Sequence, residues 1–139
     1  TAKKMHNWAF EHDEVGFNYR LPNLNAALGL AQMESFPAIL EKKRVIAQRY
    51  QDWGEDNGIQ FIKEPSCTRS NYWLNSILLK DKQQRDQFLE ITNKNGIMTR
   101  PFWRPMNELK MYQKCYVTDM DNTKFFEERV VNVPSSVKL

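Results

Sequence analysis

The sequence predicts an α/β fold in which a small β-sheet is covered by helices and preceded by long helices. Helix-like and strand-like segments follow in the order helix, helix, strand, strand, helix, strand, loop, helix, strand, which favours a sheet with helices packed on it. The 139 residues are 41% hydrophobic and 12% aromatic, which suits one globular domain with a modest core.

The first 22 residues form an irregular lead-in, because they mix aromatic and charged residues without a period. A helix is expected from Asn23 to Ser35, with Asn23 itself as the N-cap after Pro22. One apolar stripe follows the helical spacing i, i+3, i+4, i+7, made of Leu24, Ala27, Leu28 and Ala31. The domain proper is therefore expected over residues 23–139, leading helices included.

Pro37 predicts a break between this helix and a second one, which is expected to close at Gly54 and Gly58. The apolar side of the second helix holds Phe36, Ile39, Leu40, Ile46, Ala47, Tyr50 and Trp53. Its opposite face, expected to meet solvent, holds Glu41, Lys42, Arg44, Gln48 and Arg49.

Short β-rich runs predict strands over residues 59–62, 72–79, 97–99 and 130–133. Between them, Asp81 is expected to cap a helix that stops at Asn95 and Gly96, with Gln84 completing a capping-box-like pair. Prolines 101 and 105 predict an extended, irregular stretch, and a last helix is expected from Asp121 or Asn122 through Arg129.

Composition excludes several classes of function. The net charge is +3, but basic and acidic residues are interspersed, whereas a nucleic-acid-binding protein usually gathers its basic residues on one face. No apolar run approaches the ~20 residues that span a bilayer, and no apolar signal core follows the first residues. Two distant cysteines fit reduced thiols. We expect a cytoplasmic protein that binds neither nucleic acid nor membrane.

The segment Gly16–Gly29 is the most informative part of the chain. It reads Gly-Phe-Asn-Tyr-Arg, a short gap, then Asn-Ala-Ala-Leu-Gly, and it is accompanied by His-Asp-Glu-Val at 12–15 and Gly-Ile-Met-Thr-Arg-Pro at 96–101. These motifs resemble the pyridoxal-phosphate (PLP)-dependent nucleotide-sugar aminotransferases of the DegT/DnrJ/EryC1/StrS type, in the branch typified by legionaminic-acid and perosamine synthesis. The resemblance covers the whole chain and implies the small C-terminal domain of a fold-type-I aminotransferase.

The same resemblance implies what the chain does not contain. In the family, the lysine that forms the Schiff base with PLP lies dozens of residues before the Asn-Tyr-Arg turn. We therefore expect this chain to be the C-terminal part of a larger enzyme, to bind no PLP by itself and to be inactive alone. The parent would transfer an amino group, from glutamate, to a nucleotide-linked 4-keto-6-deoxy sugar for bacterial surface glycans. The alternative is a non-catalytic binding or assembly module, the remnant of an enzyme.

The resemblance also implies a cofactor site shared across a homodimer. The family's asparagine in the Asn-Tyr-Arg turn reaches the cofactor phosphate of the partner subunit, and that residue is Asn18 here. Arg20 is a second anion contact, since an amide and a guanidinium both donate hydrogen bonds in fixed geometry. The alternative is that Asn18 caps a turn and that Arg20 makes a local ion pair.

The segment Thr99–Asn107 is the second candidate site. Arginines beside aromatic rings suit a diphosphate and a sugar face, and in the family this segment lines the sugar-nucleotide pocket. We expect Arg100, Trp103 and Asn107 to contact substrate. Many family members carry His where this chain has Asn107, which cannot titrate near neutral pH. The alternative for Trp103 is that it only anchors a loop, together with Phe102.

No metal site is expected. His6, His12 and Asp13 are the only grouping with metal-ligating chemistry, and two histidines six residues apart in an irregular segment are a weak signal. No residue of this chain is expected to be catalytic, because none of its lysines lies in a context like the Schiff-base motif.

Overall fold

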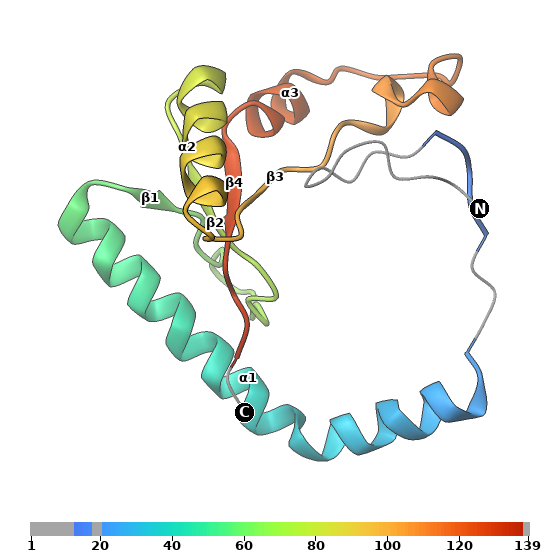
Figure 1. Ribbon diagram of the computed structural model, residues 1–139, viewed down its shortest axis with the longest axis vertical. Coiled ribbons are helices and arrows are strands. Elements are labelled where there is room, and N and C mark those ends of the chain that lie inside the picture. Colours follow the sequence, from blue (N-terminus) through green and yellow to red (C-terminus); the bar gives the residue numbers. More distant parts are fainter. Residues whose placement is uncertain (1–12, 18–20, 138–139) are drawn as a thin grey trace.

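The computed structural model describes residues 13–17 and 21–137. It contains a small antiparallel sheet with helices around it, and a long first helix that extends well beyond the sheet (Figure 1). The elements, in chain order, are α1 (Asn23–Asn57), β1 (Gln60–Phe61), β2 (Asn75–Leu78), α2 (Lys82–Lys94), β3 (Arg100–Pro101), the 3₁₀ turns η1 (Met106–Glu108) and η2 (Lys110–Tyr112), α3 (Asp121–Glu127) and β4 (Val130–Val133). This arrangement confirms the predicted small sheet with helices.

The four strands lie in the order β1-β2-β4-β3, and every neighbouring pair is antiparallel. Because side chains alternate along a strand, the register Phe61–Ile77–Val131 across three strands puts these residues on one face. They form the apolar core with Leu89 of α2, and Tyr50 of α1 packs against it. Side chains from both helices therefore meet in the same cluster.

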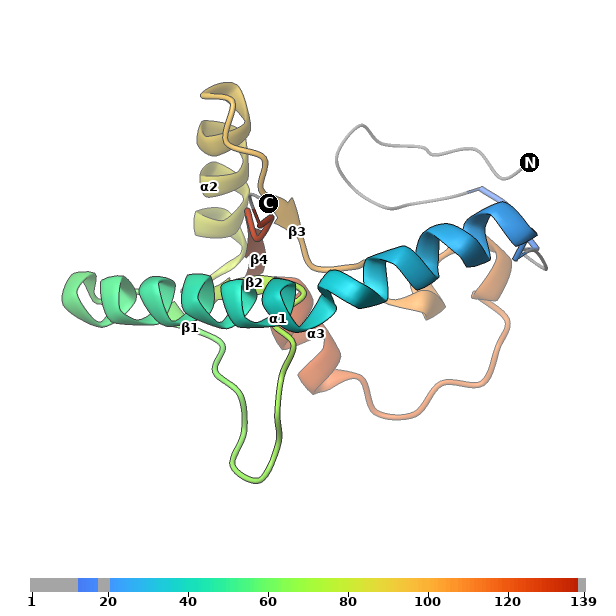
Figure 2. The ribbon, with the colours of Figure 1, turned by 90° about the horizontal axis from the view of Figure 1, so that it is seen from below.

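Helix α1 runs through Pro37 without ending, so the predicted break into two helices is wrong. Proline removes one backbone hydrogen bond but its fixed φ is compatible with a helix, so the expected result inside a helix is a kink. The ribbon of α1 bends between its N-terminal and C-terminal parts (Figures 1 and 2). The predicted cap is also wrong: Asn23 is already helical, and the N-cap position is taken by Pro22, whose side chain makes no capping hydrogen bond.

The two glycines near the end of α1 have different roles. Gly58 is the left-handed C-cap, with φ of 66°, as predicted. Gly54 instead lies inside the helix and is buried. A Cβ on it would lie 2.6 Å from the carbonyl oxygen of Ile59 and from the ring of Phe61, so glycine lets β1 fold back tightly on α1.

Helix α2 begins as predicted. The Asp81 carboxylate accepts a hydrogen bond from the Gln84 backbone N–H at 2.9 Å, while the Gln84 side chain accepts one from Lys80 N–H at 2.8 Å. Local polar side chains thus satisfy donors at this helix end.

The third strand forms later than predicted. Residues 97–99 close α2 instead: the Ile97 N–H donates to the carbonyl of Thr92 at 2.9 Å, and the buried Thr99 hydroxyl accepts from Asn93 at 3.0 Å. β3 consists of Arg100 and Pro101 at the sheet edge, a position that tolerates the missing N–H of proline.

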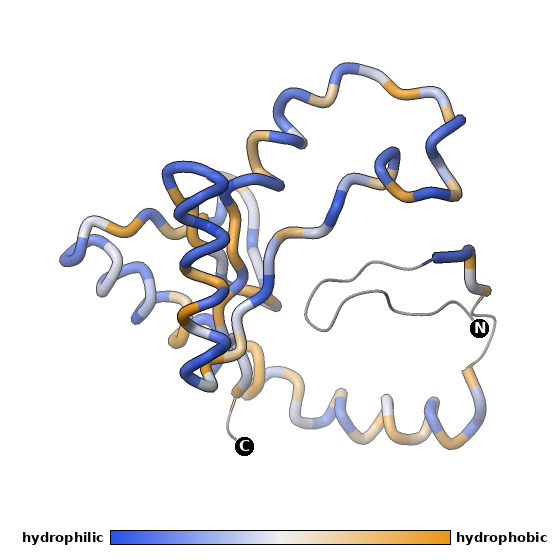
Figure 3. Tube along the Cα trace, turned by 45° about the horizontal axis from the view of Figure 1, so that its top comes forward, coloured by the Kyte–Doolittle hydropathy of each residue, from blue (hydrophilic) through white to orange (hydrophobic). Residues whose placement is uncertain are grey.

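Helix α3 and β4 follow the predicted positions, and β4 covers Val130–Val133 as expected. Hydropathy along the chain shows apolar residues on the sheet and also along the N-terminal part of α1, which leads away from it (Figure 3). Among the described residues, no helix is both long and apolar enough to cross a membrane.

Candidate functional site

The candidate site lies on β3 and the arm that follows it, residues 102–120. This arm leaves the sheet edge and carries η1 and η2 before the chain returns through α3 (Figure 1). Arg100, Trp103 and Asn107 all belong to this part of the chain, but they face different surroundings.

Arg100 lies in the edge strand and pairs in register with Asn132 of β4, which in turn pairs with Ser76 of β2. The three side chains therefore share one face of the sheet. The Ser76 hydroxyl donates to Asn132 Oδ1 at 2.7 Å, and Asn132 is only 5% exposed. The base of the half-buried Arg100 side chain thus stands at the end of a fixed polar row on the face opposite the apolar core.

Trp103 lies against another tryptophan from a distant part of the sequence. Its ring stacks on that of Trp73 with the centroids 6.1 Å apart and the planes at 30°, and it meets Phe102 edge-on at 5.9 Å. The Phe102 N–H donates to the carbonyl of Val130 at 3.1 Å, so the backbone here is tied to the sheet. Trp103 remains 42% exposed and Trp73 65% exposed.

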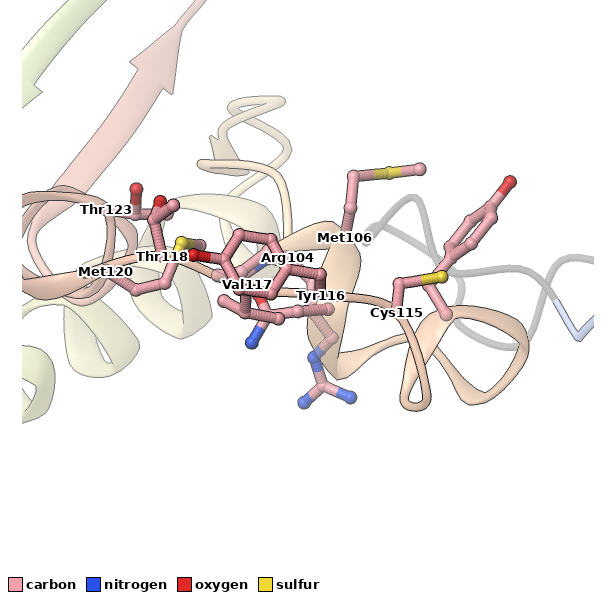
Figure 4. A pocket seen from close by; sticks show the side chains of 11 residues that line it. Arg104, Met106, Cys115, Tyr116, Val117, Thr118, Met120 and Thr123 are labelled. Carbon is pink, nitrogen blue, oxygen red and sulfur yellow. The ribbon is translucent and has the colours of Figure 1, made fainter.

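Asn107 lies at a pocket of about 540 Å³ formed by the arm and by Thr123 of α3. The lining is mostly apolar or hydroxyl-bearing, and Figure 4 shows Thr118, Met120 and Thr123 at one end and Cys115 at the other. The residues around it are Arg104, Pro105, Met106, Asn107, Tyr112, Cys115, Tyr116, Val117, Thr118, Met120 and Thr123.

The Asn107 side chain is the unusual polar group of this pocket. Its Oδ1 is buried and has no hydrogen-bond partner among the described residues, which is costly for an amide oxygen. An acceptor without a partner at the lining of a pocket is a candidate contact for a hydroxyl or amine of a ligand. Arg100 and Trp103 do not line the described pocket, whereas Arg104 does.

Arg44 was expected to face solvent, and this is wrong. It forms a two-pronged ion pair with Glu64 at 2.9 and 3.1 Å and donates to the carbonyl of Ser70 at 2.6 Å. Glu64 also accepts from the Ser70 backbone N–H. The Arg44 hydrogen bonds, followed by that from Ser70, lower the pKa of Glu64 to about 2. These contacts fix the loop between β1 and β2 on α1.

Sequence reasoning missed this ion pair and Trp73 for the same reason. Both depend on contacts between segments 20 or more residues apart, 20 for Arg44 with Glu64. The sequence marked Trp73 only as an apolar strand residue, and the strand begins two residues later, at Asn75. The exposure of a tryptophan next to a strand had no sequence signal.

Asn18 and Arg20, the expected cofactor contacts, lie outside the described residues, as do His6 and His12. Within the described ranges, no group of three or more His, Cys, Asp or Glu side chains is arranged to hold a metal ion.

Comparison with known proteins identifies relatives across the whole chain. Residues 2–139 match the DegT/DnrJ/EryC1/StrS aminotransferase family. The GDP-perosamine synthase of Vibrio cholerae is 36% identical over 127 residues, which are 89% of this chain and 35% of that protein. The GDP-perosamine synthase of Escherichia coli O157:H7 is 34% identical over 105 residues, 76% of this chain and 29% of that protein.

Solved structures share the fold. PseC of Helicobacter pylori, an aminotransferase of pseudoaminic acid biosynthesis, superposes with a TM-score of 0.74 at 23% identity, over 96% of this chain and 37% of that one. A Streptococcus pneumoniae protein assigned as a sugar aminotransferase, in its PLP form, gives 0.73 at 24% identity, over 94% of this chain and 35% of that one. The chain thus spans about a third of the length of these relatives.

Proposed function

Because this chain belongs to the DegT/DnrJ/EryC1/StrS aminotransferase family, we propose that it acts as the C-terminal small domain of a PLP-dependent enzyme that aminates a nucleotide-linked 4-keto-6-deoxy sugar. The observation that carries this proposal is the family match over residues 2–139, together with perosamine synthases among the relatives. The amino donor would be glutamate and the product a precursor of bacterial surface glycans, made in the cytoplasm.

The substrate side of the proposal rests on the arm. The Arg100 guanidinium suits the diphosphate, the Trp103 ring suits the apolar face of a sugar or base, and the Asn107 amide oxygen suits a hydroxyl or amine of the sugar. The buried Oδ1 of Asn107 has no hydrogen-bond partner within the described part of the chain, and this supports a ligand at the pocket, since an unsatisfied acceptor gains most from a donor.

The cofactor side rests on Asn18 and Arg20. An amide and a guanidinium are hydrogen-bond donors, so their chemistry fits the phosphate of PLP. We propose that Asn18 donates to the phosphate held by a partner subunit, which makes the enzyme a homodimer, and that residues 1–22 lead into the small domain of residues 23–139. PLP, when bound, supplies the electron sink for moving the amino group, and the protein supplies orientation.

By itself the 139-residue chain should neither retain PLP nor produce amino sugar, because its lysines lie outside any context like the family's Schiff-base motif. The competing proposal, a non-catalytic module, draws on Asn107, which replaces a titratable histidine found in many family members. The two proposals differ in what the full-length protein does with PLP.

The test is a visible absorbance spectrum of the full-length protein purified with PLP. A PLP band that changes on adding GDP- or UDP-linked 4-amino sugars supports the aminotransferase. A protein with no such band is the non-catalytic module. Asn18→Ala should weaken PLP retention by about 10- to 100-fold, the loss of one hydrogen bond to a charged group. The control is Asn122→Ala, at an exposed position of α3; equal PLP affinity in both variants would remove Asn18 from the site.

A further inference from the structure

Hydrogen bonds to its backbone fix the position of Trp73, although its side chain is exposed. Its backbone N–H donates to Asn71 Oδ1 at 3.0 Å, and its carbonyl accepts from the Lys43 ammonium of α1 at 3.0 Å. The same ammonium donates to the carbonyl of Ser135 after β4. Helix α1 and the end of the sheet thus both fix the position of a residue that is 65% exposed.

The residue before it, Tyr72, adopts a backbone conformation that large side chains rarely take, with φ of 44°. Three contacts hold it there. Its N–H donates to the Ser70 hydroxyl at 3.0 Å, its hydroxyl accepts from Gln51 at 3.4 Å, and the Arg44 guanidinium lies 5.5 Å from its ring centre. Strained residues held by their surroundings concentrate at functional sites. Here the strained turn points the next side chain, Trp73, toward Trp103.

The two indoles form one aromatic surface built from two distant segments, with centroids 6.1 Å apart and planes at 30°. A ring inserted between them would need about 7 Å, two contact distances of roughly 3.5 Å. A ligand ring can therefore stack on the outward face of Trp73, with Trp103 behind it, but it cannot insert between the two indoles.

The residues beside Trp103 favour a particular ligand. Arg100 and Arg104 flank Trp103 in sequence, and Arg104 forms an ion pair with Glu108 at 3.7 Å. An aromatic surface with arginines on the same segment of the chain matches a ligand that carries a planar ring and phosphates together.

We propose that Trp73, backed by Trp103, is the stacking surface for the base of the nucleoside diphosphate that carries the sugar. This assignment rests on the proposed function, because it names the part of that substrate which the aromatic pair contacts. Trp73 is a substrate-contact residue, and Lys43 and Tyr72 are its positioning residues.

The test measures binding of GDP, UDP and inorganic pyrophosphate to the full-length PLP-loaded protein by calorimetry. Trp73→Ala should weaken binding of the preferred nucleoside diphosphate about tenfold or more, the size expected for one base–aromatic stack, and leave pyrophosphate unchanged. Trp73→Phe should restore most of the affinity. The matched control is Trp53→Ala, at a tryptophan of α1 that is 51% exposed and should not change binding.

Several results would overturn the assignment. One is nucleoside diphosphate binding that Trp73→Ala does not change. Another is an equal loss of pyrophosphate affinity in Trp73→Ala. A third is that the wild-type protein binds neither GDP nor UDP. If Trp73→Ala lowers the melting temperature but not nucleotide affinity, the pair packs against the rest of the protein instead. An active aminotransferase with unchanged binding in Trp73→Ala would refute this assignment alone, whereas nucleotide stacking without any PLP spectrum would refute only the proposed function.

Discussion

The two halves of α1 belong to one continuous helix but differ in what they contact. The C-terminal half, residues 39–57, contains the buried Ala47 and Gly54, and its Tyr50 ring stacks on Phe61 with centroids 5.3 Å apart. In the N-terminal half, every residue from 23 to 38 is exposed, with Leu24 at 80% and Leu28 at 61%. Both halves have apolar residues at helical spacing (Figure 3).

This difference shows that an apolar stripe predicts a helix without predicting its partner. Most helical stability in proteins comes from packing an apolar face, and only the C-terminal half has that packing among the described residues. The N-terminal half exposes a stripe of the kind that marks an interaction surface. We expect it to make the isolated chain self-associate.

The largest expected effect on stability comes from a substitution that removes packing against the C-terminal half of α1. Phe61 is 7% exposed and lies against Tyr50 and Gly54, so Phe61→Ala should lower the free energy of unfolding by about 3–5 kcal/mol. Denaturant unfolding of the chain, followed by circular dichroism, measures this. The matched change in the other half is Phe36→Ala, at a residue 43% exposed, which should cost less than about 1 kcal/mol. Equal costs would mean that the N-terminal half is packed in solution.

Some features of the fold could be predicted from the sequence and others could not. Local signals predicted the Asp81 cap, the glycine stop at Gly58 and the strand Val130–Val133, because each depends on residues a few positions apart. Pro37 was misjudged because the fixed φ of proline is compatible with a helix, so the one missing hydrogen bond does not end α1.

The candidate site divides in the same way. A sequence motif was enough to select Arg100, Trp103 and Asn107. Residue type alone gave their chemistry: a hydrogen-bond donor, an aromatic ring and an amide. The Trp73–Trp103 stack and the Arg44–Glu64 pair could not, because each joins segments brought together only by folding. The pocket at Asn107 likewise needs residues 112–123 to return beside η1.

A second test replaces one glycine with alanine in each half of α1. Gly54→Ala should destabilise the chain by about 1–3 kcal/mol, since the new Cβ would lie 2.6 Å from both Ile59 O and the Phe61 ring. Gly29→Ala should stabilise it by about 0.5–1 kcal/mol, because no described atom outside the helix's own nearby backbone would lie within 4 Å of the new Cβ and alanine favours the helix. The same denaturant titration gives both values. Two changes of the same sign would contradict the contrast between the halves.

The smallest effect concerns how the packed half holds the loop before β2. Glu64 has its pKa lowered from about 4.5 to about 2, first by the Arg44 hydrogen bonds and then by the Ser70 N–H. A carboxyl whose pKa is depressed on folding stabilises the protein above its ordinary pKa, and this contribution is lost as the pH falls through the folded value.

The coupling free energy between Arg44 and Glu64 can be measured with a double-mutant cycle of Arg44→Gln and Glu64→Gln. It should be constant above about pH 4.5 and shrink toward pH 2. Because both side chains are partly exposed, at 28% and 22%, added salt should also reduce it. A coupling that stayed the same from pH 7 to pH 2 would contradict a contribution of the ionised Glu64 carboxylate to holding the loop.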